Sequence, residues 1–196
     1  MTEQTDQSDD SPINLLHDKL LIEIFNYFEA EKLLQISRVC RRFRRVALDF
    51  QVLKEIKFEG PVPEDALELV LQSTRECRSI IFGLNQKMNL ETLQNSRDHL
   101  RSIRSIQFNQ SQLTGEFLNE MPTLFPALTS LSCFLCQIHQ INGELGQLHR
   151  LVYLRYLDLK STPIRDEELL NFMNGLPSGQ LLSLKFLLHD EAYVHH

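Results

Sequence analysis

The stretch from Ile13 to Ile56 reads INLLHDKLLIEIFNYFEAEKLLQISRVCRRFRRVALDFQVLKEI, and its apolar spacing predicts three short helices. In the first, Asp18 is a candidate N-cap, and one apolar stripe follows it: Leu20, Leu21, Ile24, Phe25 and Phe28. The third helix carries an apolar face of four residues: Cys40, Phe43, Ala47 and Phe50. Three helices of about ten residues cannot close a substantial core alone, so this piece should complete its core against the chain that follows.

The same stretch resembles the F-box family, whose pattern runs Leu-Pro, Glu-Ile-Phe, two leucines, and Val-Cys-Arg-Arg before an aromatic residue. The matching residues here are Leu16-His17-Asp18, Leu20-Leu21, Glu23-Ile24-Phe25, Leu33-Leu34 and Val39-Cys40-Arg41-Arg42-Phe43. Three positions depart from the pattern, since His17 replaces a Pro, while Phe43 and Leu53 replace Trp residues. The first change removes a residue suited to the first turn of a helix, and Leu53 offers less area for packing onto the next domain.

This resemblance implies that the chain is the substrate receptor of a Skp-adaptor–cullin–F-box ubiquitin ligase and performs no chemistry itself. Its implied partners are the Skp adaptor, through it a cullin scaffold, and a protein substrate. Apolar residues of the first two helices are then the expected adaptor contacts: Leu16, Leu20, Ile24, Phe25, Leu33 and Leu34.

After Ile56 the sequence repeats, and the template L-x-x-L-x-L-x-x-N matches six times. The matches are Leu53/Ile56/Phe58/Pro61, Cys77/Ile80/Phe82/Asn85, Ile103/Ile106/Phe108/Ser111, Leu128/Leu131/Cys133/Cys136, Leu154/Leu157/Leu159/Thr162 and Leu181/Leu184/Phe186/His189. The third template position recurs every 24 to 27 residues. The pattern resembles leucine-rich repeats.

Each period also holds a helical apolar stripe. The stripes are Leu67, Val70, Leu71; Leu90, Leu93, Leu100; Phe117, Leu118, Met121, Leu124; Ile141, Leu145, Leu148, Leu151; and Leu169, Leu170, Met173, Leu176. A short strand and one helix cannot bury both apolar faces alone, so stacked repeats should form a parallel sheet over one continuous core. Six strands give a concave sheet about 24 Å long.

We therefore predict an α/β protein: an N-terminal three-helix F-box-like module followed by a right-handed leucine-rich-repeat solenoid with a parallel sheet. Residues 1–12 (MTEQTDQSDDSP) form a disordered acidic tail, residues 13–52 the F-box, and residues 53–196 about six repeats. The net charge of −6 implies no general affinity for nucleic acid. With no signal peptide and no apolar run of about 18 residues, we expect no membrane association and a cytoplasmic or nuclear location.

Two motifs allow a chemical reading beside a structural one. Cys133-x-x-Cys136 could be half of a zinc site, but no second pair follows, and the repeat template instead assigns Cys133 to the core and Cys136 to the Asn slot. A run of five arginines could bind phosphates or an acidic peptide, or could be the solvated face of an F-box helix: Arg38, Arg41, Arg42, Arg44 and Arg45. No phosphate loop or catalytic constellation accompanies them, so we expect no cofactor, no metal and no enzymatic activity.

Binding should lie on the concave face, where strand residues between core positions point outward. Most of these are small or polar, and the bulky exceptions are Ile81, Phe134, Tyr156 and Leu187. Phe134 and Tyr156, one strand apart and about 5 Å between strand axes, are the expected central anchors for a substrate. The alternatives are that Phe134 tucks under the next repeat or that the register is shifted by one residue. A further alternative for the whole chain is a protein-binding scaffold that acts outside a ligase.

Overall fold

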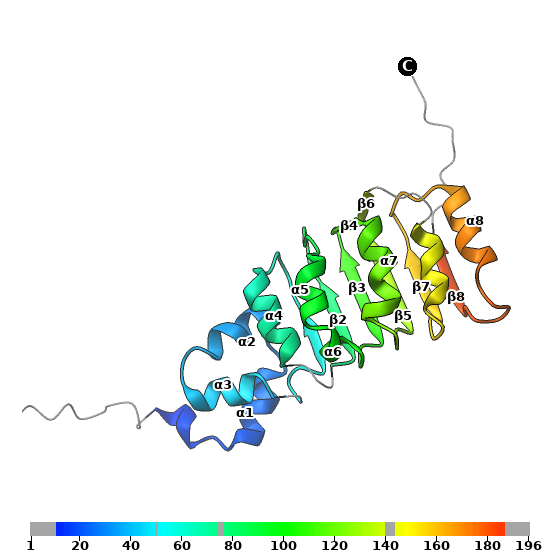
Figure 1. Ribbon diagram of the computed structural model, residues 1–196. Helices are drawn as coiled ribbons and strands as arrows, with labels where there is room; N and C mark the ends of the chain where they lie inside the picture. The colour runs from blue at the N-terminus through cyan, green and yellow to red at the C-terminus, as the bar shows by residue number, and fades with distance from the viewer. Residues whose placement is uncertain (1–10, 50, 74–76, 140–143, 187–196) are drawn as a thin grey trace, which may run out of the picture.

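The computed structural model describes residues 11–49, 51–73, 77–139 and 144–186. An N-terminal group of helices leads into a row of strand and helix units, stacked side by side with the helices on one face of a sheet (Figure 1). The helices are η1 (Pro12–Leu15), α1 (Asp18–Phe25), α2 (Ala30–Ile36), α3 (Arg41–Ala47), α4 (Glu64–Gln72), α5 (Leu90–Asn95), α6 (Arg97–Leu100), α7 (Gly115–Leu124), η2 (Glu144–Arg150) and α8 (Asp166–Asn174). The strands are β1 (Glu55–Lys57), β2 (Ser79–Phe82), β3 (Ser105–Asn109), β4 (Gln112–Thr114), β5 (Ser130–Phe134), β6 (Gln137–His139), β7 (Tyr156–Leu159) and β8 (Ser183–Phe186).

The three predicted N-terminal helices are present as α1, α2 and α3. Their centre includes an edge-to-face contact between Phe25 and Phe43, whose ring centroids are 5.7 Å apart. The N-cap prediction for Asp18 was wrong, because Asp18 is the first helical residue and His17 is the cap, without a side-chain capping bond. Of the predicted acidic tail, the structure describes only Ser11 and Pro12, and Pro12 already begins η1.

The six predicted strands form one parallel sheet in the order β1-β2-β3-β5-β7-β8. Its register follows the sequence template: one row of directly paired residues consists of Ile56, Ile80, Ile106, Leu131, Leu157 and Leu184. Five of these are buried and Leu184 is partly buried. Because each pairing joins consecutive repeats, the sheet grows by one strand per repeat, which is the arrangement that stacking requires.

A column of phenylalanine rings fills the core beneath the first three strands. Phe58 stacks on Phe82 at 5.8 Å between ring centroids, and Phe82 stacks on Phe108 at 5.1 Å. Phe117 of α7 closes the column with an edge-on contact to Phe108 at 5.6 Å. The N-terminal helices belong to the same hydrophobic core, since their buried residues and those of the repeats form one cluster. The F-box-like helices therefore complete their core against the repeats, as their small size requires.

The turn after each strand is held by a buried polar side chain that bonds to the preceding repeat. Ser111 Oγ donates to the Gly83 carbonyl (3.2 Å), Cys136 Sγ to the Phe108 carbonyl (3.5 Å) and Thr162 Oγ1 to the Cys133 carbonyl (2.6 Å). In the second repeat the assignment of Asn85 to this slot was wrong. The buried side chain there is Gln86, whose Oε1 accepts from the backbone N–H of Val62 (2.9 Å).

The shift in the second repeat follows from one extra residue between strand and turn. The residue before each slot has a positive φ, and these residues are Asn85 (58°), Gln110 (47°), Leu135 (53°) and Ser161 (57°). Gln86 lies four positions after Phe82, whereas in the later repeats the slot residue lies three positions after the last core residue of the strand. The longer segment in the second repeat includes Gly83. A Cβ at Gly83 would lie 2.2 Å from the Glu59 carbonyl oxygen, so this close approach of two turns requires glycine.

Two helical predictions need correction. Of the stripe predicted after the fifth strand, Leu169 and Leu176 pack against the core, but Leu170 and Met173 are exposed, and α8 buries Phe172 instead. Phe172 lies three residues after Leu169 and therefore shares its face. The helix predicted between the fourth and fifth strands of the sheet is the 3-10 helix η2, which contains the poor helix former Gly146. Ile141, a member of the stripe predicted there, lies outside the described residues.

A second parallel pair, β4 and β6, was not predicted.

Candidate functional site: an apolar docking surface and a concave sheet

Arg42 of α3 holds the start of α1 in place. Its Nε donates to Asp18 Oδ1 at 2.8 Å, its Nη1 donates to the Asn14 carbonyl at 2.9 Å, and its Nη2 donates to the Leu16 carbonyl. Arg45 donates to the second oxygen of Asp18. The hydrogen bond from Arg42 lowers the pKa of Asp18 below its ordinary value, and the positive charges of Arg45 and Arg42 act in the same direction. Two of the five arginines are therefore structural, while Arg38, Arg41 and Arg44 are exposed.

The N-terminal helices expose a group of large apolar side chains, which we call the α1 surface: Leu15, Leu20, Ile24, Tyr27, Phe28 and Val39. Leu20 and Ile24 follow the helical spacing of four residues along α1, and Tyr27 and Phe28 continue past its end. Leu15 and Tyr27 keep 86% and 89% of their surface exposed. Several large apolar side chains exposed on one small group of helices are typical of a surface that binds another protein, because leaving them in water is unfavourable.

The structure divides the six predicted adaptor contacts. Leu20 and Ile24 are exposed and Leu16 is partly buried, but Phe25, Leu33 and Leu34 are buried in the chain's own core. For these three, the expectation of a direct partner contact is corrected, because their side chains already pack against other parts of the chain. The helical period alone could not separate the two faces, since apolar residues cover most of α1.

Four members of the α1 surface were not among the predicted adaptor contacts: Leu15, Tyr27, Phe28 and Val39. Phe28 belonged to the apolar stripe predicted for the first helix. The available signal for Tyr27 was its position seven residues after Leu20, which places it on the same helical face. Leu15 ends the one-turn helix η1 and Val39 lies between α2 and α3, and neither segment is long enough for a period to indicate which way a side chain points.

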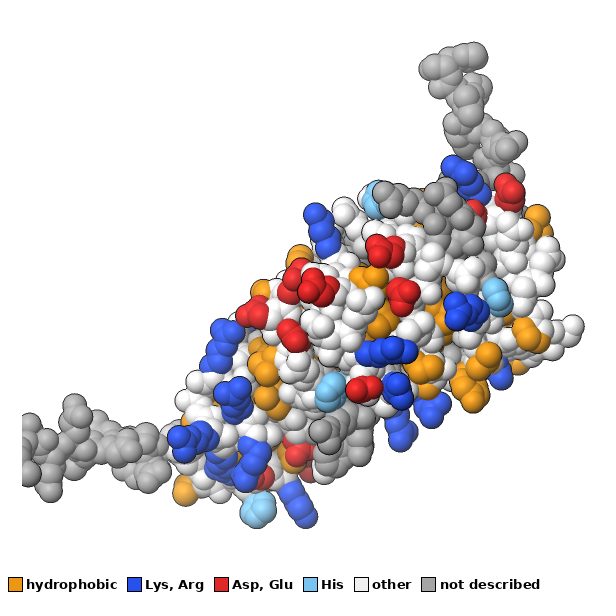
Figure 2. Space-filling model, viewed as in Figure 1, with side chains coloured by type: hydrophobic (Ala, Val, Ile, Leu, Met, Phe, Trp, Pro, Cys, Tyr) orange, Lys and Arg blue, Asp and Glu red, His pale blue; other side chains and the backbone are white. Residues whose placement is uncertain are grey.

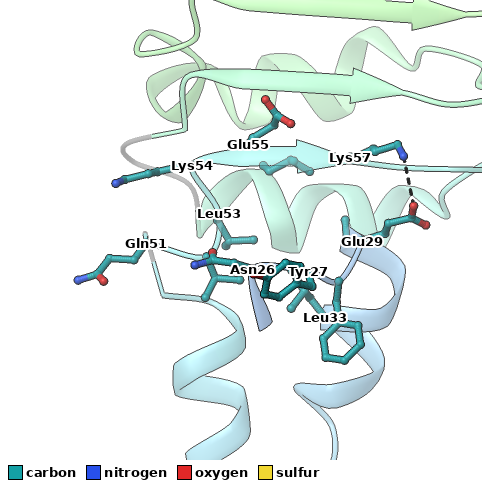
Figure 3. A pocket seen from close by; sticks show the side chains of 13 residues that line it. Asn26, Tyr27, Glu29, Leu33, Gln51, Leu53, Lys54, Glu55 and Lys57 are labelled. Atoms are coloured by element: carbon teal, nitrogen blue, oxygen red, sulfur yellow. Dashed lines mark hydrogen bonds and ion pairs between the residues drawn. The ribbon is translucent and has the colours of Figure 1, made fainter. Parts of the chain in front are cut away.

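A cleft of about 440 Å³ separates the α1–α2 turn from β1 (Figure 3). Tyr27 and Phe28 line it, so the α1 surface continues into the cleft. Lys57 Nζ lies 3.4 Å from Glu29 Oε1 across it, and partial burial together with Glu59 raises the pKa of Glu29. Glu31 Oε1 accepts from the backbone N–H groups of Glu59 (3.0 Å) and Gly60 (3.4 Å). These polar contacts join α2 to the end of β1.

The outward face of the sheet carries three of the four predicted substrate anchors. Phe134 and Tyr156 keep 45% and 50% of their surface exposed, while Ile81 is half-buried. Leu187 lies outside the described residues. Phe134 therefore does not tuck under the next repeat, and the register is not shifted.

Phe134 and Tyr156 are not direct neighbours, which corrects the expected central pair. Tyr156 pairs with Ser130, the first residue of β5, whereas Phe134 is the last residue of that strand. Four residues of strand separate the two levels, or about 13 Å along the sheet. Any partner that contacts both rings must therefore span the full length of the strands.

The two cysteines of the Cys133-x-x-Cys136 motif are buried and engaged within the repeats. The hydrogen bond with Cys136, together with burial, raises the pKa of Cys133. Burial also raises the pKa of Cys77 to about 12, so the Cys77 and Cys133 thiols carry no charge near neutral pH. The same hydrogen bond with Cys133 lowers the pKa of Cys136. Within the described ranges, no three His, Cys, Asp or Glu side chains are grouped closely enough to hold a metal ion. No helix in the same ranges has the length and apolar character needed to cross a membrane.

Comparison with known proteins gives one family assignment. The family model named F-box-like matches residues 15–59, which include α1, α2, α3 and β1. The chain thus carries an F-box-like domain at its N-terminal end, which supports an F-box protein and a role in protein–protein interaction. F-box domains generally bind the Skp adaptor.

Comparisons beyond this domain add little. No curated protein matches the chain. Among solved structures, the crystal structure of a TLR13–ssRNA13 complex is similar at 18% identity and a TM-score of 0.44. The similarity covers 60% of this chain and 17% of that one, so the chain corresponds to a small part of that protein. A likeness at this level carries no argument about function.

Proposed function

We propose that this chain is the substrate-recognition adaptor of a Skp-cullin-F-box ubiquitin ligase, acting in the cytoplasm or nucleus. In this proposal the F-box-like domain binds the Skp adaptor, and the remaining units form a right-handed leucine-rich-repeat solenoid whose sheet binds the protein to be ubiquitinated and degraded. The chain itself performs no chemistry. The observation that carries the proposal is the α1 surface, because it exposes apolar side chains on the domain that matches the F-box-like model.

The α1 surface has the composition of a helix-binding interface. Its members include Leu20 and Ile24 on α1 and the rings of Tyr27 and Phe28 at the end of that helix. Fully burying a Leu, Ile or Phe side chain is favourable by about 1.5–3 kcal/mol, so a few such residues can supply most of the affinity of a specific interface.

The contacts between the F-box-like domain and the repeats support a role in positioning a bound substrate relative to the adaptor. Lys57 and Glu29 pair across the cleft, Glu31 holds the end of β1, and buried Leu53 lies in the continuous core. Leu53, which stands where the F-box pattern has a Trp, is buried in the same core as the repeats. A rigid junction fixes the bound protein relative to the adaptor, which raises the effective concentration of its lysines near the transferring enzyme.

Affinity purification of the intact chain from proteasome-inhibited cells tests the proposal. We expect both the Skp adaptor and a cullin to be recovered, and client proteins to accumulate when the proteasome is blocked. Recovery of the Skp adaptor without a cullin would favour a scaffold that acts outside a ligase. Absence of both from a folded, purified chain would overturn the docking role.

A further inference from the structure

Four cations form a row at the edge of the sheet where the strands begin: Lys54, Arg78, Arg104 and Arg155. Each stands two residues before the central core residue of its strand, so the four occupy equivalent positions. The backbone connects them directly, because Arg78 N–H donates to the Lys54 carbonyl (3.0 Å) and Arg104 N–H donates to the Arg78 carbonyl (2.8 Å). Between Arg104 and Arg155 the series passes through Thr129. Thr129 N–H donates to the Arg104 carbonyl and Arg155 N–H donates to the Thr129 carbonyl, both at 2.8 Å.

The row concentrates positive charge on a protein whose net charge is −6. Neighbouring strands are about 4.8 Å apart, and like charges directly opposite each other on adjacent strands are destabilising. Among the ion pairs between described residues, none includes a member of the row. Lys and Arg side chains gather along the lower edge of the repeats in Figure 2, and Lys54 projects away from the sheet at the start of β1 (Figure 3).

On the outward face of the sheet, the residue that follows the row position is a serine on β2, β3 and β5. Ser79, Ser105 and Ser130 are paired in register on β2, β3 and β5, and all three are partly exposed. On β1 the equivalent residue is Glu55, whose charge disfavours an anion there. The region that favours anions therefore runs from β2 to β7, with Arg78, Arg104 and Arg155 at its edge.

Arg155 is already held in position at the end of this region. Its Nη1 donates to the carbonyls of Leu154 (3.0 Å) and Val152 (3.2 Å), and its side chain is partly buried. A preordered guanidinium loses less entropy when it pairs with a carboxylate than a freely moving one does.

We propose that this edge binds an acidic peptide segment of a protein, laid across the strands from β2 to β7. Carboxylates of the peptide would pair with the guanidinium groups. A peptide fits better than a nucleic acid because the exposed rings beside the row, Tyr153 and Tyr156, both lie at its β7 end, so bases laid along β2 and β3 would have little to stack on. The inference goes beyond the proposed function, since it does not require docking to an adaptor.

Fluorescence anisotropy with the purified chain and a labelled Glu-rich peptide of about ten residues tests the inference. A Gln-rich peptide of the same length and an unlabelled single-stranded oligonucleotide serve as comparison ligands. We expect binding of the Glu-rich peptide that weakens with added salt, and about a tenfold loss of affinity in the double variant Arg78→Gln/Arg104→Gln. The variant Arg78→Lys/Arg104→Lys should retain part of the binding because it keeps the charge.

A matched control removes two charges elsewhere. Arg41 and Arg44 on α3 are exposed and form no ion pair among the described residues, so Arg41→Gln/Arg44→Gln changes the net charge equally. Its peptide affinity should stay within about twofold of the starting chain, and circular dichroism should show that both double variants are folded. Equal losses in the two double variants would show binding by overall charge and overturn the inference. Stronger binding of the oligonucleotide than of the peptide, or no peptide binding at low salt, would also overturn it.

Discussion

Arg42 and Asp18 lie 24 residues apart in the sequence, yet the Nε of one donates to the Oδ1 of the other at 2.8 Å. The same guanidinium also binds the carbonyls of Asn14 and Leu16. A single side chain of α3 therefore orders the segment that presents Leu15 and starts α1, through an ion pair whose two side chains are partly exposed.

Replacing Asp18 with Asn should lower the stability of the folded chain at pH 7 in urea denaturation. The pKa of Asp18 is depressed in the folded state, so its contribution is fully present above the unfolded value near 3.8 and is lost as pH falls through the lower folded value. The difference in urea midpoint between the two chains should thus be constant from pH 7 to pH 5 and shrink below pH 3.8. A difference that grows on acidification would contradict this assignment.

Replacing His17 with Pro should stabilise the chain. His17 has φ −67° and Leu16 before it is extended at ψ 135°, both of which suit an X-Pro pair. The hydrogen bonds described for His17 use its carbonyl, not its N–H. We expect a gain of about 0.4–1 kcal/mol from a less flexible unfolded chain, measured by thermal or urea unfolding. We also expect slightly tighter adaptor binding, because the start of α1 becomes more rigid. Weaker binding would instead indicate that His17 itself contacts the adaptor.

Thiol alkylation should distinguish Cys40 from the other three cysteines. Cys40 is exposed, whereas Cys77, Cys133 and Cys136 are buried in the repeats. Mass spectrometry after treatment with iodoacetamide should find one modified cysteine in the folded chain and four after unfolding. Rapid modification of Cys136 in the folded chain would show that the turn holding it to Phe108 opens readily.

Truncating Phe134 and Tyr156 to Ala tests client capture by the concave face. If both rings anchor the client, the double variant should bind it roughly tenfold or more weakly. The rings stand about 13 Å apart along the sheet, so the two single losses should add to within about 0.5 kcal/mol of the double loss. A client recovered by affinity purification provides the ligand, and titration of each variant provides the free energies. Normal capture by a folded double variant would move recognition away from these rings.

The strand register could be read from the sequence because apolar residues alternate and the repeat fixes their phase, as the row from Ile56 to Leu184 shows. In the second repeat the same reasoning assigned the buried turn position to Asn85, which was wrong. One extra residue near Gly83 moves that position to Gln86. Burial of Leu33 and Leu34 depends on how α2 meets the repeats, and a helical period carries no such information. The row of Lys54, Arg78, Arg104 and Arg155 could also have been found in the aligned repeats, because each cation lies two residues before the central core residue of its strand.

Docking through the α1 surface is the central claim, and titration of the purified Skp adaptor with the variant Leu20→Ala/Ile24→Ala tests it most directly. Both side chains are more than 40% exposed, so their truncation should leave folding nearly unchanged. Removal of their apolar area should weaken adaptor binding by about 2–5 kcal/mol in total. The variant Phe134→Ala/Tyr156→Ala is the matched control and should bind the adaptor with unchanged affinity. Full adaptor affinity in a folded Leu20→Ala/Ile24→Ala chain would contradict the account.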